Sequence, residues 1–231
     1  MIALLFLLLS FLFCIEASTS ISRKSGYAIN NAASGLILQS SLGLLSRALI
    51  FMFMPLIGAL SDTGSIYSNS YSVTLSFLLL PSMLFLLFIF RVEVEKIFLT
   101  LLKRVEVHGS YFKKVKFVNN IPRTDSRLRT AKKFKGLYIV VFLSYIPYYL
   151  AWPFIIILLN TYPENRGFIL GLSSVFNGVN TLVLTLFVDP KLAKLGMYRN
   201  LILSVYNELL LVRLFSSLAA FLLFLAVSIF I

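Results

Sequence analysis

The sequence predicts an all-α membrane protein, a polytopic bundle of about six transmembrane helices. Of its 231 residues, 59% are hydrophobic and 13% charged, which is more apolar surface than a soluble domain of this length can bury. The apolar residues form runs long enough to cross the roughly 30 Å hydrocarbon layer of a bilayer at about 1.5 Å per residue. The basic residues gather between these runs, as they do in membrane proteins.

Six apolar segments meet the length requirement: 2–22, 32–60, 71–91, 137–160, 167–188 and 213–231. No Lys or Arg precedes the first, and no small-residue cleavage site follows it, so we expect a retained helix rather than a signal peptide. The second is longer than it needs to be, so its cytoplasmic end should leave the bilayer. In the fourth, Pro147 and Pro153 bracket aromatic residues, which predicts a kinked helix with an aromatic anchor.

Charge predicts the orientation. Thirteen Lys and Arg lie in 91–135, and placing this stretch in the cytoplasm puts both termini on the outside. The connection 61–70 has no basic residue and falls outside. In this arrangement 19 of the 21 basic residues, Arg213 among them, lie on the cytoplasmic side.

The chain 1–231 is expected to be a single transmembrane domain that contains a basic cytoplasmic loop, 92–136. Inside the loop, apolar residues recur at helical spacing with charges opposite, which predicts an amphipathic helix on the inner leaflet: Val94, Ile97, Phe98, Leu101, Leu102 and Val105. The loop is expected to contact anionic phospholipid headgroups and not nucleic acid, because basic loops are an ordinary topology signal.

The two sets of three helices on either side of the loop would run in opposite directions. The sequence GLILQSS at 35–41 echoes GFILGLSS at 167–174. These two observations favour a 3+3 inverted repeat.

Two charged residues lie within predicted spans, where lipid penalises them. Glu16 lies near the inner end of the first span and Arg47 near the middle of the second. One interpretation is an ion pair that joins the two helices. The other places Arg47 in a polar cavity, where its fork of donors suits a phosphate and Glu16 restrains it or exchanges protons.

Polar and small residues also share one face of the second and of the fifth span. The second has Gln39 with Gly35, Gly43 and Arg47, and the fifth has Asn177 and Thr181 with Ser173 and Thr185. Small residues of this kind serve tight helix packing, whereas amides are larger than packing needs. Both a packing face and a lined path therefore remain open.

Several chemistries are excluded by the supply of residues. One cysteine, Cys14, and one histidine, His108, allow no internal disulfide and no Cys/His metal cluster. No phosphate-binding Gly-Lys-Ser/Thr loop and no catalytic arrangement of Ser, His and carboxylates is present. We therefore expect neither an enzyme nor a bound cofactor or metal.

The sequence resembles the Amj family in several diffuse segments. They are EASTSISR at 16–23, LLSR at 44–47, PLIGALSD at 55–62, the Asn177-Gly178 pair and LFVDP at 186–190. The resemblance is concentrated in 14–62 and 165–192 and is poor in 92–136. The residues that carry it, besides those already named, are Pro55, Asp62, Gly178, Asp189 and Pro190.

Amj proteins are alternate lipid II flippases of bacterial peptidoglycan synthesis, so the resemblance implies a multi-pass protein of the bacterial inner (cytoplasmic) membrane that carries lipid II to the outer leaflet. On this hypothesis Arg47 binds the pyrophosphate, while Arg23 and Lys24 gather the headgroup at the cytoplasmic mouth. Asn177 and Thr181 would bind the sugar or peptide. The alternatives are a flippase for another polyprenyl-linked glycan, a small-solute or ion transporter, and a non-transporting scaffold. The sequence does not fix an oligomeric state or an energy source.

Overall fold

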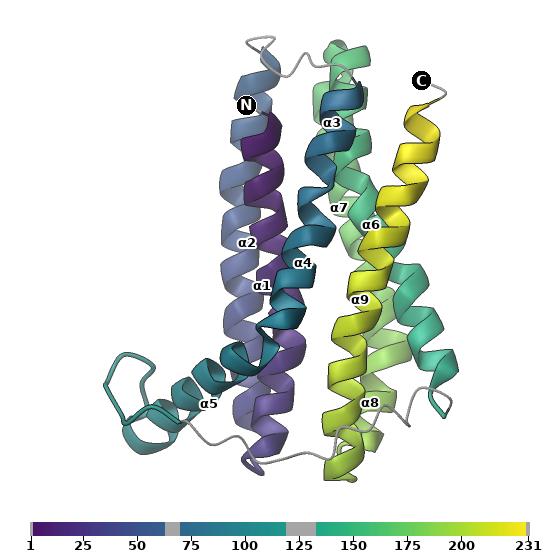
Figure 1. The fold of residues 1–231 in the computed structure, drawn as a ribbon. Helices are drawn as coiled ribbons and strands as arrows, with labels where there is room; N and C mark the ends of the chain where they lie inside the picture. The colour runs from purple at the N-terminus through teal and green to yellow at the C-terminus, as the bar shows by residue number, and fades with distance from the viewer. Residues whose placement is uncertain (1, 63–69, 119–132, 230–231) are drawn as a thin grey trace.

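The computed structural model describes residues 2–62, 70–118 and 133–229, and within them the chain is a helical bundle (Figure 1). Six of its helical stretches are long and apolar enough to cross a membrane, which confirms the predicted fold class. They are α1 (Ile2–Ala28), α2 (Ala32–Asp62), α3 (Ser70–Phe77) with α4 (Leu79–Ile89), α6 (Lys135–Thr161), α7 (Arg166–Val183) with its continuation, and α9 (Arg199–Ser228).

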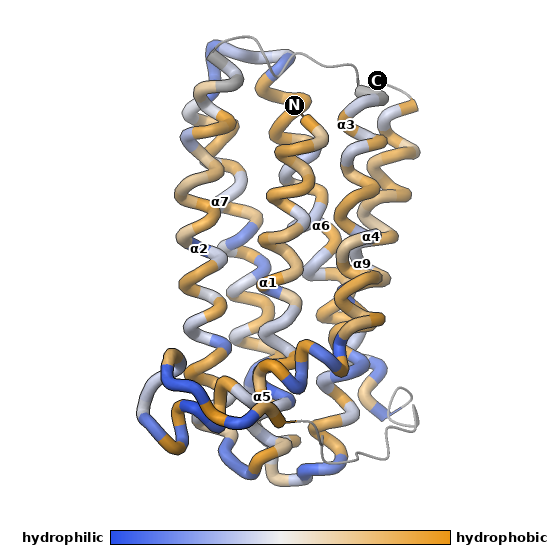
Figure 2. The backbone as a smooth tube through the Cα atoms, turned by 60° about the vertical axis from the view of Figure 1, so that its left-hand side comes forward, coloured by the Kyte–Doolittle hydropathy of each residue, from blue (hydrophilic) through white to orange (hydrophobic). Residues whose placement is uncertain are grey.

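The bundle has two different ends. Helix α1 begins and α9 ends at one of them, which we call the terminal end, while α5 (Arg91–His108) lies across the other, the α5 end (Figure 1). Hydrophilic residues gather at the α5 end, whereas the spans are mostly apolar (Figure 2). This distribution is the one that a bilayer around the spans requires.

Helix α5 is the predicted amphipathic helix, and it packs against α1 with Phe98, Leu99 and Leu102 buried. It ends at Gly109, whose left-handed backbone (φ 64°) closes the helix. One detail differs from the expectation that all charges lie opposite the apolar side. Glu95 is buried on the packed side, because it has an ion-pair partner on α1.

The fifth span changes its winding before it reaches the α5 end. After the short 3₁₀ turn η1 (Pro163–Asn165), α7 runs to Val183, continues as a π-helical segment, η2 (Leu184–Val188), and then as α8 (Asp189–Leu195). Pro190 lies in the first turn of α8, where a missing N–H costs nothing. The wider turn of η2 changes the direction in which Asp189 leaves the helix.

The three spans before α5 and the three spans after it pack in the same way within each half. Helix α1 packs against α2 and α4, as α6 packs against α7 and α9, and α4 packs against α9 across the two halves. Helix α1 runs away from the terminal end and α6 runs towards it (Figure 1). These neighbours and directions are those that a 3+3 inverted repeat requires.

Helices α2 and α7 lie at the periphery. Helix α2 packs mainly against α1, and α7 mainly against α6, and they are the least buried of the six spans. The last span also differs from expectation: it begins at Arg199 rather than near residue 213. Arg213 therefore lies in the middle of a membrane span and not at the cytoplasmic surface.

Candidate functional site: a polar cavity inside the bundle

A polar cavity of about 170 Å³ lies in the middle of the bundle, between α2 and α7. Its floor is formed by α1, α6 and α9. We call it the central cavity. It brings together four predicted site residues, Glu16, Arg47, Asn177 and Thr181. It also contains Arg213, which is predicted to lie at the cytoplasmic surface.

The Glu16 carboxylate is held by hydroxyl groups and not by an ion pair. The Tyr148 hydroxyl donates to Glu16 Oε2 at 2.7 Å, and the Ser46 hydroxyl lies 3.3 Å from Oε1. Tyr148 is buried on α6, edge-on to Phe13, rather than anchored at a membrane surface as its position beside Pro147 suggested. No ion pair joins Glu16 to Arg47 among the described residues, so the predicted staple of α1 and α2 is not formed.

Arg213 is fixed in place by two contacts. Its Nη1 donates to the backbone oxygen of Glu16 at 2.7 Å, and its guanidinium lies over the Tyr145 ring, 4.5 Å from the centroid. Within the described residues no carboxylate pairs directly with Arg213, and its remaining donors are available to the cavity.

Arg47 has more freedom than Arg213. Within the described part of the chain its guanidinium makes no hydrogen bond and no ion pair, although it acts electrostatically on Glu16. It is exposed on α2 at the side of the cavity. An arginine at the centre of a span costs roughly 2.5–3.5 kcal/mol to insert. Ionisable side chains within spans are by default candidate functional residues, so Arg47 is a candidate ligand-binding group.

Two amides line the α7 side of the cavity. Asn177 is partly buried and Asn180 is buried, with its Oδ1 unpartnered among the described residues. Thr181 donates its hydroxyl to the Asn177 backbone oxygen at 2.8 Å, so Thr181 is mainly satisfied within its own helix. The amides are the groups on α7 that have hydrogen-bonding capacity left for a ligand.

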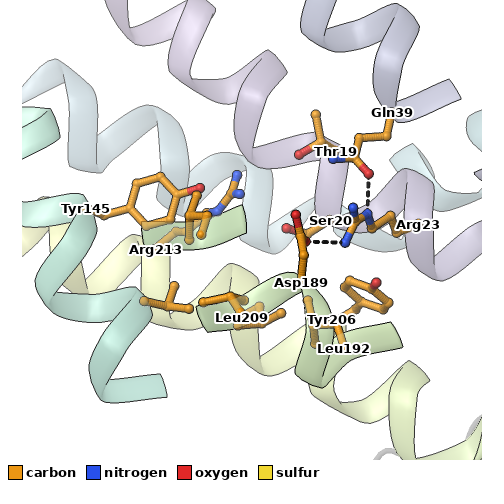
Figure 3. Close-up of a pocket in the computed structure, with 13 residues that line it drawn as sticks. Thr19, Ser20, Arg23, Gln39, Tyr145, Asp189, Leu192, Tyr206, Leu209 and Arg213 are labelled. Atoms are coloured by element: carbon orange, nitrogen blue, oxygen red, sulfur yellow. Dashed lines mark hydrogen bonds and ion pairs between the residues drawn. The ribbon is translucent and has the colours of Figure 1, made fainter. Parts of the chain in front are cut away.

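A second cavity of about 90 Å³ adjoins the first on the side of α8, and we call it the α8 cavity. Figure 3 shows Arg23 between Gln39 and Asp189, where its Nη1 donates to Asp189 at 2.8 Å and its Nε donates to Gln39. Arg23 thus joins α1, α2 and α8. Thr19, Tyr145 and Arg213 line both cavities, so a continuous row of polar groups links them.

Lys24 differs from its predicted role at the mouth of the path. It is buried and pairs with Glu95 of α5 at 2.6 Å, and it lines neither cavity. Adjacent residues on a helix point about 100° apart, so Lys24 faces α5 while Arg23 faces α2 and α8. The structure places Arg23 at the site and Lys24 in a structural ion pair.

The glycines show which small residues serve packing. A Cβ on Gly26 would lie 2.6 Å from the Gly35 Cα, so α1 and α2 touch backbone to backbone at the α5 end. A Cβ added at Gly43, on the same predicted face as Gly35, or at Gly178 on α7 would meet nothing within 4 Å. Tight packing therefore accounts for Gly35 and does not account for Gly43 or Gly178.

Among the described residues, side-chain contacts join α2 to α7 on one side of the cavity and to α8 on the other. Towards the terminal end, Arg166 donates to the Ser61 backbone oxygen at 3.4 Å, and the Ser173 hydroxyl lies 3.9 Å from the Met54 sulfur. Towards the α5 end, the Arg23, Gln39 and Asp189 cluster closes the space. The central cavity thus lies behind a window between two peripheral helices.

The remaining motif residues occupy varied places. Pro55 is exposed inside α2, and Pro190 is exposed in the first turn of α8. Gly178 is exposed on α7. Asp62 is the last residue of α2, and its side chain is outside the described part of the structure. No group of three metal-ligating residues comes together within the described residues.

The fold and site define a multi-pass helical membrane protein with a basic, laterally placed polar cavity at mid-span. Comparisons with protein-family models, with curated proteins and with solved structures find no match to this chain. The cavity itself is therefore the feature from which a function can be inferred.

Proposed function

We propose that the protein is a flippase that carries a polyprenyl-pyrophosphate-linked glycan, such as lipid II, from the cytoplasmic to the outer leaflet of the bacterial inner membrane. The observation that carries the proposal is Arg47, which has no ion-pair partner among the described residues and lies in a mid-span polar cavity that also contains Arg213. A phosphate group cannot cross hydrocarbon without such partners, and arginine is well suited to bind it.

The position of the cavity supports a lipid rather than a soluble substrate. Helices α2 and α7 separate it from the surrounding bilayer, and they meet through few contacts. A polyprenyl tail can therefore stay in the lipid while its phosphates enter between the two helices. The glycan would follow the row of polar groups from the α8 cavity to the central cavity.

The size of the cavity requires movement. Its 170 Å³ is well below the roughly 300–1,000 Å³ of pockets that enclose a drug-sized ligand. This volume suits the phosphates and not a disaccharide with a peptide. Transport would open first the Arg23–Asp189–Gln39 cluster and then the contacts at the terminal end, as alternating access requires.

The proposed direction follows from charge. Basic residues at the α5 end place this end in the cytoplasm, so the Arg23 cluster would be the entry and the Met54–Ser173 contact the exit. The α5 helix would then lie on the inner leaflet, where its charges meet anionic headgroups.

The test is rescue of a bacterium depleted of its own lipid II flippase. The wild-type protein should keep such cells alive, and a periplasmic enzyme that acts on exposed lipid II should release its soluble product. Asn177→Leu should lower this product without removing the protein from the membrane. Ser174→Leu, which changes an exposed residue on the same helix that lines neither cavity, should leave it unchanged.

The small volume of the cavity favours a second candidate, a transporter of a small inorganic anion. Such a protein would take up phosphate or sulfate into liposomes and would not rescue the depleted cells. Abundant, correctly inserted protein that exposes no lipid II would overturn the flippase proposal.

A further inference from the structure

The central cavity contains two positive charges and one negative charge within the described residues: Arg47, Arg213 and Glu16. With Glu16 ionised, its net charge is +1, which a single phosphodiester balances. A diphosphate that is esterified at both ends carries two negative charges. Balance with a diphosphate diester therefore requires Glu16 to be neutral, because an unbalanced charge in a membrane interior is costly.

The surroundings of Glu16 suit both protonation states. When it is ionised, Tyr148 donates to Oε2 and Ser46 can donate to Oε1. When Oε1 carries a proton, it can donate to the Ser46 oxygen, because the Ser46 hydroxyl lies 3.2 Å from the Gly43 backbone oxygen and can donate there instead. A proton can therefore come and go without a side chain being displaced.

We propose that Glu16 takes up one proton when the lipid-linked diphosphate enters the cavity and releases it when the lipid leaves. This inference rests on the proposed function and adds its coupling to protons. The proton comes from water, binds the Glu16 carboxylate as the two phosphates are paired with Arg47 and Arg213, and returns to water on release. No covalent bond of the lipid is changed.

Glu16 is the group in the cavity that can accept the proton. The charged and titratable groups that act on it are Arg47 on α2, Tyr145, Tyr148 and Tyr149 on α6, and Arg213 on α9, while Cys14 on α1 acts on Tyr149. No other carboxyl group lines the central cavity within the described chain. Asp189, in the adjoining α8 cavity, is already paired with Arg23, and that cavity offers a polar route for the proton from the α5 end.

The test measures proton uptake upon binding to the purified full-length protein in nanodiscs. The probe is a prenyl-diphosphate-linked N-acetylhexosamine, in which both phosphates are esterified and keep two negative charges across the working pH range. Calorimetry in two buffers with different ionisation enthalpies counts the protons. We expect about one proton taken up by the wild type, and a Kd that rises by up to about tenfold per pH unit as Glu16 ionises.

Two variants and one second probe sharpen the test. Glu16→Gln, which keeps the shape and the hydrogen bond from Tyr148, should bind the probe with no proton uptake and with a Kd independent of pH. Tyr148→Phe should keep the uptake and move the pH at which it is half complete. A prenyl-monophosphate-linked hexose, with one negative charge, should bind the wild type without a proton.

Each outcome decides between the two proposals. Binding of the diphosphate probe with no proton uptake and a flat Kd would leave the lipid site standing and overturn the proton coupling. Proton uptake that persists in Glu16→Gln would overturn it as well. If neither lipid binds the wild-type protein, the proposed function fails and the coupling fails with it.

Discussion

Arg47 and Glu16 illustrate how two residues of opposite charge can lie near each other without forming a pair. The carboxylate is occupied by Tyr148 and Ser46, which are neutral and therefore do not cancel its charge. The guanidinium is consequently left to a ligand. A direct ion pair would have removed both charges from the cavity and left only packing to explain them.

The binding role of Arg47 predicts the behaviour of a double variant. Arg47→Gln should abolish flipping at normal protein levels, and Glu16→Gln combined with Arg47→Gln should be equally inactive. The reason is that the phosphate ligand is missing in both. The measurement is rescue of flippase-depleted cells together with immunoblotting of membranes.

A control for lost charge is Lys191→Gln on α8, whose side chain is exposed and lines neither cavity. This variant should rescue fully. Recovery of activity in the double variant would instead show that Arg47 only compensates Glu16, and the site would have to be abandoned.

The sequence predicted four of the polar residues that line the central cavity and missed Arg213. Glu16, Arg47 and Asn177 could be found because each is a polar residue inside an otherwise apolar run. Arg213 could not be recognised as a residue within a span, because polar residues such as Asn207 and Glu208 precede it and the predicted apolar segment starts at Arg213. The buried hydrogen bond from Tyr138 to Glu208 explains how such an acid is accommodated inside α9.

Helices α2 and α7 are the elements whose relative movement the proposed cycle requires. We expect a disulfide between Met54→Cys and Ser173→Cys, made in a Cys14→Ala background, to stop transport. The reason is that the contact between these two positions must open at the exit. Transport should return when a reductant breaks the bond. The measurement is release of lipid II product before and after reduction.

A matched pair on helices that are not expected to separate is Phe142→Cys with Ser216→Cys, between α6 and α9, where the Ser216 hydroxyl donates to the Phe142 backbone oxygen at 3.2 Å. This crosslink should leave transport intact. Equal inhibition by both pairs would mean that rigidity in general, and not the window, limits transport.

Helix α5 depends on a buried ion pair for its position. Lys24→Ala would leave Glu95 charged and unpaired beneath α5, which costs about 3–5 kcal/mol when a buried pair is broken. We expect α5 to detach and become sensitive to protease in inside-out vesicles. The double variant Lys24→Met with Glu95→Leu should restore protection from protease, because apolar residues of similar volume replace both charges. If the double variant stays sensitive, contacts other than this ion pair hold α5 against α1.

The elements themselves were largely predictable, since lipid imposes length and hydropathy on every span. The interruptions differ in this respect. The break at Leu78 between α3 and α4 follows Phe77, whose carbonyl would accept a hydrogen bond from residue 81 in a continuous helix, and Pro81 has no N–H to donate, so a proline in the sequence marks this break. The π-helical Leu184–Val188 segment has no such marker in the sequence.

The whole molecule has a predicted orientation that can be measured directly. In a Cys14→Ala background, Glu164→Cys in the turn before α7 should react with a membrane-impermeant thiol reagent in intact cells. Ser110→Cys, just beyond α5, should react only after the membrane is opened. The opposite pattern would place the basic end outside and reverse the proposed direction of transport.

The paired arrangement of the two halves was suggested by a short sequence echo, and the helix neighbours agree with it. What the sequence did not show is that the polar site lies where the halves meet. That placement depends on which helices touch, and a hydropathy pattern contains no such information.

The close approach of Gly26 and Gly35 has a mechanical consequence. It is the point at which α1 and α2 touch backbone to backbone, and it lies beside the short turn that joins them at the α5 end. If α2 rotates about this contact, the displacement of each of its residues grows with the distance from the glycine pair. A small rotation there would displace Met54 much more than Gln39, so that the far side of the window opens widest.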